Sequence, residues 1–292
     1  MLTTEPLIGY TTKSLTGFNM STLKPGEIFE NEHKEYNHLF FLIKGKAIIS
    51  NLETIGYIIN TGDFFFIPIS SEILCEAVYP CDIIIFSYPD EYYSIYEQDY
   101  FRGLWKLSGA MDYSFEPIRM NPPISLFMDG FKDYFKYRLD QTEISKFKQE
   151  EFFCLLTLSY PKEKIVSLFY PAIGKSLEFR RFIFENYLKV KNVEELIQLC
   201  DATRKTFDRQ FLDEFGVSAY QWILSQRAKH VRFSLAETDD KMKIIMERYG
   251  FTIASHFTRF CWEQFDYAPL KFRKHLKEKK NLTLERCKLI LD

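Results

Sequence analysis

The chain lacks the features of membrane, secreted and zinc-binding proteins. No apolar run among its 292 residues approaches the roughly 18–20 residues of a membrane span. Its start, MLTTEPLIGYTTKS, has neither a basic flank nor an apolar stretch, so we expect no signal peptide and a cytoplasmic location. The six cysteines include no CxxC pair, which argues against a zinc knuckle or a thioredoxin-like site. Buried free thiols are the favoured interpretation.

Residues for catalysis are also scarce. The first 174 residues hold only two histidines, His33 and His38, whereas a metal-dependent cupin enzyme needs about three histidines and a carboxylate. Five positions apart on one strand, they would point to opposite faces. Glu35 and Glu72 could add oxygen ligands, but the set stays incomplete. Since no nucleophile–base pair or phosphate-binding loop appears either, we predict no enzyme activity, no cofactor and no metal.

The net charge of −2 is unevenly distributed. Residues 1–174 carry a net charge of −8 and residues 175–292 a net charge of +6. This asymmetry favours a polyanionic partner for the second half alone, although an excess of this size also arises by chance.

Short β-like runs dominate the segment from Phe18 to Tyr88. Turn residues such as Gly45, Gly56 and Gly62 separate these runs. Such spacing predicts a β-sandwich or barrel. The runs are LFFLIKGKAIIS (39–50), YIIN (57–60), DFFFIPIS (63–70) and CDIIIFSY (81–88).

A helical pattern begins after Pro122 and Pro123. An apolar stripe at four-residue intervals predicts one helix, and a second helix is expected from Glu143 to Ser159. We therefore predict a helical connector over 121–174. The stripe could form a dimer interface or pack on the chain's own β domain. Its members are Phe127, Phe131, Phe135 and Leu139.

From Ser176 onward the pattern is entirely helical and contains a repeat. The decapeptide FDRQFLDEFG begins at Phe207, and FTRFCWEQFD begins fifty residues later at Phe257. The caps expected for the two helices, Thr203 and Thr252, differ by 49, so the second copy should carry one extra residue just past its cap. Each copy follows a shorter helix, which predicts two helix–turn–helix units joined by a helix over 219–236.

The second helix of each unit supplies candidate DNA contacts. Phe207, Phe211 and Phe215 should face the core and leave the polar side chains outside. Basic side chains can contact phosphates or guanine edges, and Arg209 and Arg259 recur at the same place in both copies. Arg204 and Asp208 could instead pair along the helix surface, and His256 could be a plain surface histidine. The candidates are Thr203, Arg204, Lys205, Thr206, Asp208, Arg209, Thr252, Ala254, Ser255, His256 and Arg259.

Over Ser176 to Lys274 the sequence resembles the DNA-binding domain of AraC-type (AraC/XylS) transcription regulators. The resemblance rests on VEELIQLCDATRKTFDRQFLDEFGVSAYQWI, QRAKH and IIMERYGFTIASHFTRFCWEQFDYAPLKFRK. It implies a sequence-specific regulator that places two recognition helices in adjacent major-groove segments. Asp201 and Asp266 replace glycines of the family, and we expect both to adopt left-handed backbone. Cys261 and Trp262 replace a Phe and a basic residue, which removes one phosphate contact.

The first half resembles, less closely, the cupin-like effector-binding or dimerisation domain of the same family. The expected fold is thus a multidomain chain: an all-β cupin-like barrel over 1–120, the connector, an all-α domain with two helix–turn–helix units over 175–275, and a tail over 276–292. The implied partners are double-stranded DNA, a small-molecule effector, a second copy of the chain and RNA polymerase. The residues proposed for an effector pocket could equally just fill the barrel. They are Tyr36, His38, Phe40, Phe64 and Phe66.

Two other classes of function stay open on the sequence. The chain could be a cupin-type small-molecule binding protein or enzyme whose helical half mediates protein contacts. It could also be a purely structural helical scaffold, which would leave Arg209 and Arg259 unused. A steep loss of affinity for DNA with rising salt would distinguish a regulator from both.

Overall fold

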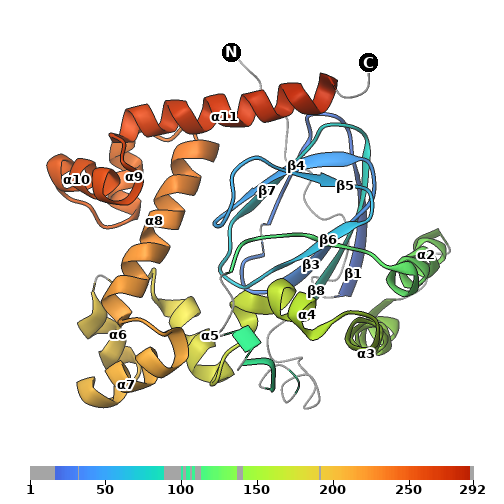
Figure 1. Cartoon of the computed structure of the whole chain (residues 1–292), viewed down its shortest axis with the longest axis horizontal. Coiled ribbons are helices and arrows are strands. Elements are labelled where there is room, and N and C mark those ends of the chain that lie inside the picture. The colour runs from blue at the N-terminus through green and yellow to red at the C-terminus, as the bar shows by residue number, and fades with distance from the viewer. Residues whose placement is uncertain are drawn as a thin grey trace. The chain divides into compact units, whose positions relative to one another are not determined.

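The computed structural model has two compact units, which are described separately (Figure 1). The first unit holds the β-rich segment and the helices up to Ile173, and the second holds the helices from Gly174 together with residues 50–57. Within the described part of the chain, every helix is too short or too polar to cross a membrane. The structure describes residues 17–31, 33–88, 100, 103–105, 107–108, 113–136, 141–190 and 192–289.

Two β-sheets form the first unit, and every strand pair with a defined register is antiparallel. The predicted strands 57–60 and 81–88 match β5 and β8. The predicted run 39–50 divides in two at Gly45, whose φ of +104° only glycine adopts readily. One sheet orders its strands as β1 (Gly17–Leu23), β8 (Cys81–Tyr88), β3 (Asn37–Lys44), β6 (Asp63–Ile67) and β9 (Ile118–Arg119). The other contains β2 (Ile28–Glu30), β7 (Ile73–Ala77), β4 (Lys46–Asn51) and β5 (Tyr57–Asn60).

The two sheets enclose an apolar core between them. Phe40 and Leu42 from β3 meet Phe29 from β2 and Ile85 from β8 in this core. The predicted all-β character is confirmed. The described strands form two separate sheets, however, so they show a sandwich and no closed barrel.

Helices cover the outer face of the five-stranded sheet. They are α2 (Pro122–Lys136), α3 (Gln141–Ser159), α4 (Lys162–Phe169) and the short η2 (Tyr170–Ala172). Phe127 and Phe131 of α2 are buried in a second core with Phe41 and Phe64 of the sheet, so these members of the apolar stripe pack on their own domain. Leu139 and the side chain of Phe135 lie outside the described residues.

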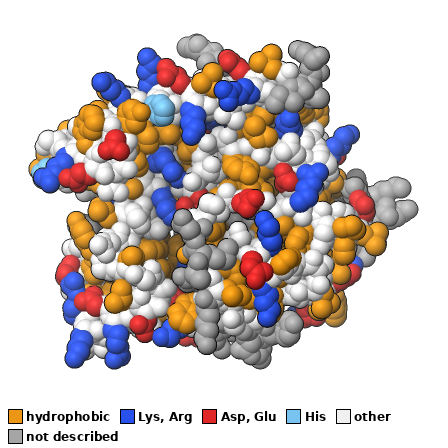
Figure 2. Space-filling view, viewed as in Figure 1, with side chains coloured by type: hydrophobic (Ala, Val, Ile, Leu, Met, Phe, Trp, Pro, Cys, Tyr) orange, Lys and Arg blue, Asp and Glu red, His pale blue; other side chains and the backbone are white. Residues whose placement is uncertain are grey.

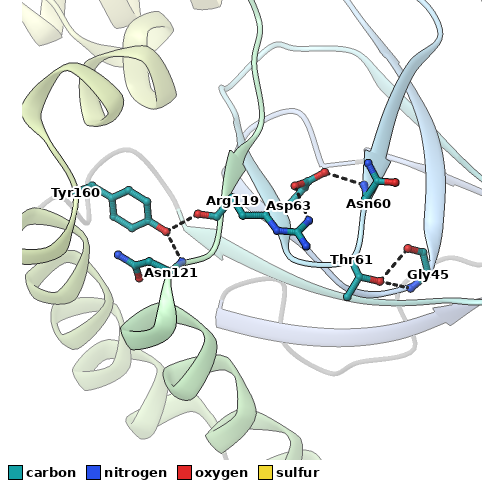
Figure 3. Close-up of polar contacts among 7 residues, drawn as sticks. All are labelled: Gly45, Asn60, Thr61, Asp63, Arg119, Asn121 and Tyr160. Atoms are coloured by element: carbon teal, nitrogen blue, oxygen red, sulfur yellow. Dashed lines mark hydrogen bonds and ion pairs between the residues drawn. The ribbon is translucent and has the colours of Figure 1, made fainter.

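A set of polar contacts attaches these helices to the sheet (Figure 3). The Tyr160 hydroxyl donates to the Arg119 carbonyl oxygen at 2.7 Å and accepts from the Asn121 backbone N–H at 2.8 Å. The Arg119 side chain pairs with Asp63 at 3.1 Å, and Asp63 also accepts from the Asn60 backbone N–H at 2.7 Å. One chain of contacts thus runs from the end of α3 through β9 to the β5–β6 turn.

The second unit contains seven helices within the described residues. The expected helix over 219–236 is α8, and α11 extends through the predicted tail as far as Leu289. The helices are α5 (Leu177–Asn186), α6 (Val193–Leu199), α7 (Arg204–Phe215), α8 (Ala219–Glu237), α9 (Met242–Arg248), α10 (Ala254–Phe265) and α11 (Pro269–Leu289).

All six cysteines are free thiols, in line with the sequence-based interpretation. Cys75, Cys81, Cys261 and Cys287 are buried, whereas Cys154 is exposed. Burial raises the pKa of the Cys261 thiol to about 12, so this thiol is unreactive at neutral pH.

Candidate nucleic-acid interface

The helical unit has two apolar cores, and α8 belongs to both. Trp222 and Ile223 near the start of α8 join the core of α5, α6 and α7. Val231 and Leu235 near its end join the core of α9, α10 and α11. Figure 1 shows α7 and α10 at opposite ends of α8. The predicted pair of helix–turn–helix units is therefore present, with each second helix packed on a core of its own.

Local sequence signals define the first recognition helix, α7. The Thr203 hydroxyl accepts from the Thr206 backbone N–H and caps the helix, as predicted. Phe207 and Phe211 are fully buried, which fixes the face that α7 turns inward. Gly216 closes the helix in left-handed conformation, at φ +72°.

A buried carboxylate anchors the end of α7. The Glu214 side chain is only 2% exposed and pairs with Arg180 of α5 at 3.5 Å. It also accepts from the Ser176 backbone N–H at 2.8 Å. A Cβ added at Gly174 would lie 2.0 Å from a carboxylate oxygen of Glu214, so a larger residue here would displace this side chain. The C-terminal end of α7 is thus bound to α5 and to the chain just before it.

The second recognition helix, α10, starts one residue later than the cap prediction. Its N-cap is Ile253, which makes no side-chain cap hydrogen bond, so the assignment of Thr252 as the cap is wrong. Residues 200–203 separate α6 from α7, whereas the longer segment 249–253 separates α9 from α10. The extra residue of the second copy therefore lies in the turn before the helix, and it places Thr252 outside the cap position.

Both aspartates that replace family glycines have left-handed backbone, as predicted. Asp201, in the first turn, has a φ of +49°. Asp266, directly after α10, has a φ of +60° and forms the helix C-cap. A short polar side chain tolerates this conformation better than other side chains do, so both turns survive without glycine.

All eleven candidate DNA-contacting residues are exposed. Six belong to α7 or its cap, and the other five to the turn before α10 and to α10 itself. Trp262, one turn beyond Arg259 in α10, is also 51% exposed. Figure 2 shows basic and acidic side chains interspersed over the helical unit. The exposed residues are Thr203, Arg204, Lys205, Thr206, Asp208, Arg209, Thr252, Ala254, Ser255, His256 and Arg259.

Two of the candidate arginines already have carboxylate partners. Arg204 lies 2.9 Å from Asp208 and 2.6 Å from Glu194, so the predicted surface pairing is present and extends to α6. Arg259 lies 2.6 Å from Glu263. Hydrogen bonds to Asp208 and Glu194 raise the pKa of Arg204, and the bond to Glu263 raises the pKa of Arg259. Phosphates would compete with these carboxylates for the guanidinium groups.

Two buried hydrogen-bonded pairs involve side chains of α8. The Tyr187 hydroxyl and His230 Nε2 are 2.5 Å apart, and both residues are buried. One turn further along α8, the Ser234 hydroxyl lies 2.8 Å from the Tyr249 hydroxyl. Tyr187 comes from the first core and Tyr249 from the second, so α8 makes a specific polar contact with each core.

The residues expected to form an effector pocket are divided between two cores. Phe40 faces the core between the sheets, whereas Phe64 and Phe66 face the helices on the other side of the sheet. His38 is buried and its Nδ1 lies 2.8 Å from the Ser87 hydroxyl, while Tyr36 is half-buried in the turn before β3.

Sequence reasoning missed two buried polar residues of the first unit, Ser87 and Asn31. Ser87 follows the inward-facing residues of β8 by regular alternation, and this pattern could have revealed it. Asn31 lies two residues beyond the inward-facing Phe29 and is 1% exposed. Among the described residues no group of three or more His, Cys, Asp or Glu side chains is placed to hold a metal ion.

Comparisons with known proteins agree with this arrangement. Residues 198–275 match the family described as a helix-turn-helix domain. Among curated proteins, none matches this chain.

Several solved structures are similar at low identity. ToxT from Vibrio cholerae O395, bound to (E)-4-(8-methylnaphthalen-1-yl)but-3-enoic acid, is 14% identical over 89% of this chain and 100% of its own, with a TM-score of 0.40. Wild-type ToxT from strain SCE256, bound to an unsaturated fatty acid, is 14% identical over 88% and 94%, with a TM-score of 0.43. The DNA-binding domain of AdpA, in complex with a target DNA, is 23% identical over 36% and 94%, with a TM-score of 0.33.

The family match covers the turn of the first unit, both recognition helices and the start of α11. It coincides with the repeated units, their exposed polar faces and their separate cores. Residues 198–275 are accordingly a helix-turn-helix domain, in agreement with the resemblance of this part of the sequence to the DNA-binding domain of AraC-type regulators.

Proposed function

We propose that the chain reads a two-part DNA site with α7 and α10 in adjacent major-groove segments. The observation that carries the proposal is the repeat: both helices bury their aromatic residues in separate cores and leave their polar faces exposed. Arg209 and Arg259 occupy equivalent positions and are the leading contacts.

The length of α8 supports this geometry. Its 19 residues span about 28 Å at 1.5 Å per residue. Successive major-groove segments on one face of DNA are about 34 Å apart. Helices packed at the two ends of α8 would therefore meet neighbouring segments with little bending of the DNA.

The first unit would regulate this binding. An effector-binding or dimerisation role would suit its buried two-sheet core, and a small molecule is the effector we propose; ToxT, a structural neighbour, has been solved with small molecules bound. A second copy of the chain and RNA polymerase would be the protein partners. We propose no catalytic activity for either unit.

The remaining alternative is a small-molecule binding protein whose helical half contacts other proteins. The buried polar residues of the first unit give this alternative its one structural support, since they could hold a ligand regardless of DNA binding.

Selection from a random duplex pool tests the proposal. The full-length protein should enrich two short motifs about one helical turn apart, with an affinity that falls steeply as salt rises. A single enriched motif would mean that only one helix reads bases. Weak, unselective binding, with or without candidate effectors, would favour the protein-contact alternative.

A further inference from the structure

Each recognition helix exposes one large apolar side chain, and both helices are described along their whole length. Leu212 of α7 is 55% exposed and Trp262 of α10 is 51% exposed. The two occupy equivalent positions, because they lie fifty residues apart like the other members of the repeat. A single exposed apolar residue is common on a protein surface, whereas the same exposure at the same place in two repeated helices indicates a shared contact.

Both side chains lie on the helix face that carries the leading DNA contacts. In each helix the apolar residue follows an arginine by three positions and another exposed residue by seven. At about 100° per residue, these three positions fall within about 60° around the helix, opposite the buried phenylalanines. The sets are Lys205, Arg209 and Leu212 in α7 and Ser255, Arg259 and Trp262 in α10.

The position along the helix indicates which part of the DNA they would meet. Leu212 and Trp262 are each the ninth residue of their helix, which lies about 12 Å beyond the first at 1.5 Å per residue. The major groove is about 12 Å wide. When the N-terminal residues of a recognition helix contact base edges, the ninth residue therefore reaches the edge of the groove, where deoxyribose and phosphate line the DNA.

The two side chains suit the sugar–phosphate backbone in different ways. The Leu212 side chain has no polar atom and can only pack on the carbon atoms of deoxyribose. Trp262 can pack in the same way, and its indole N–H can also donate to a phosphate oxygen. Neither side chain is charged, so neither neutralises a phosphate or releases a counterion.

The charges around the two side chains favour DNA over a protein partner. Lys205 and Arg209, on the same face as Leu212, carry positive charge that complements phosphate. Lysine is depleted at protein–protein interfaces. The acidic neighbours Asp208 and Glu263 are both paired with arginines, which reduces their repulsion of the DNA backbone.

We propose that Leu212 and Trp262 pack on deoxyribose at the edges of the two major-groove segments, and that the Trp262 indole N–H donates to a phosphate oxygen. The proposal rests on the proposed function, since it assigns further contacts to the same two helices. These contacts add an uncharged contribution to affinity that is independent of base sequence. Arg209 and Arg259 supply the charged contribution.

The fluorescence of Trp262 in the full-length protein measures this contact directly. The chain has two other tryptophans, Trp105 and Trp222, and Trp222 is only 7% exposed. The difference between the native protein and Trp262→Phe, each saturated with duplex, isolates the Trp262 signal. Acrylamide quenching of this signal should fall by roughly threefold or more on addition of duplex, because the indole loses its access to solvent. Unchanged quenching in the saturated complex would overturn the proposal.

Affinity measurements separate these contacts from those of the arginines. Leu212→Ala and Trp262→Ala should each lower affinity by roughly fivefold or more, equally for selected and unselected duplexes and with the native salt slope. Trp262→Phe should lie between, because it keeps an aromatic ring and loses the donor. Leu282→Ala, at a position of α11 that is also 55% exposed, is the matched control and should keep the native affinity. Native affinity in either Leu212→Ala or Trp262→Ala, with the fold verified by circular dichroism, would contradict the assignment.

A protein interface would give a different result. If both alanine variants keep the native affinity for DNA while a native dimer dissociates in analytical ultracentrifugation, the two side chains join copies of the chain. That outcome would also overturn the proposal.

The proposed function can fail independently of these contacts. If the native protein enriches a two-part site and Trp262 stays open to acrylamide in the complex, the backbone contact is wrong and the DNA-reading function stands. If selection enriches no motif but an unselected duplex shields Trp262, the two-part site is wrong and the backbone contact stands.

Discussion

Replacement of Arg259 by alanine should weaken DNA binding in a salt-dependent way. The Arg259 side chain is 80% exposed on α10, so its loss leaves the core of the unit intact. Each phosphate contact contributes about 0.9 to the slope of log affinity against log salt. Salt lowers the affinity of both proteins between 50 and 200 mM. Without one such contact, the fold-loss of affinity over this range should be smaller than the native fold-loss by a factor of roughly 3.5.

Fluorescence anisotropy with a selected duplex would measure this slope. Arg209→Ala should behave like Arg259→Ala if the two equivalent positions do the same work. Lys274→Ala is the matched control, because Lys274 is 79% exposed on α11 and pairs with Glu278 at 3.8 Å across one helical turn. The control should retain the native slope.

The Arg259–Glu263 ion pair provides a second test of whether Arg259 contacts DNA. Glu263→Gln should increase affinity at low salt, because Arg259 is no longer shared with a carboxylate and one negative charge leaves the exposed face of α10. In an Arg259→Ala background the same change should have a smaller effect, which a double-mutant cycle would measure.

The outcome that refutes this reasoning is specific. If Arg209→Ala and Arg259→Ala both fold, as circular dichroism would show, and both keep the native affinity, salt slope and base preference, neither arginine contacts DNA. A relaxed base preference with an unchanged slope would instead assign the arginine to a base edge.

Three further predictions concern stability. Asp266→Gly should stabilise the helical unit by about 1 kcal/mol in urea titrations, because glycine adopts φ +60° without strain; an unchanged midpoint would contradict this. Tyr187→Phe should cost about 1–3 kcal/mol through the lost hydrogen bond to buried His230, and a neutral result would mean that the network adds nothing to stability. Because burial lowers the pKa of His38 from 6.5 to about 4, the unfolded state takes up a proton first as pH falls. Stability should therefore drop by about 3 kcal/mol between pH 6.5 and 4, and His38→Gln should remove this component.

Local signals predicted most of the helical unit. The helix α7 is defined by signals that act within one or two helical turns, so a short sequence pattern contains them. These signals are the N-cap Thr203, the C-cap Gly216 and the four-residue spacing of buried Phe207 and Phe211. The left-handed backbone of Asp201 and Asp266 was equally readable.

The start of α10 shows where local reasoning failed. A threonine before a helical pattern is a good cap signal, yet the helix begins after Ile253. The position of an extra residue within a turn depends on how α9 and α10 pack together, and a cap preference of about 1 kcal/mol does not override that packing.

The sequence by itself determined that this chain carries two helix–turn–helix units with equivalent exposed arginines, because helical periodicity and turn chemistry are local. Only the tertiary structure decided which face of β3 and β6 meets which core, and that His38 and Ser87 are partners in the β3–β8 register. These residues come from separate strands, and the register between distant strands is set by the burial of whole sheets, which no short stretch of sequence encodes.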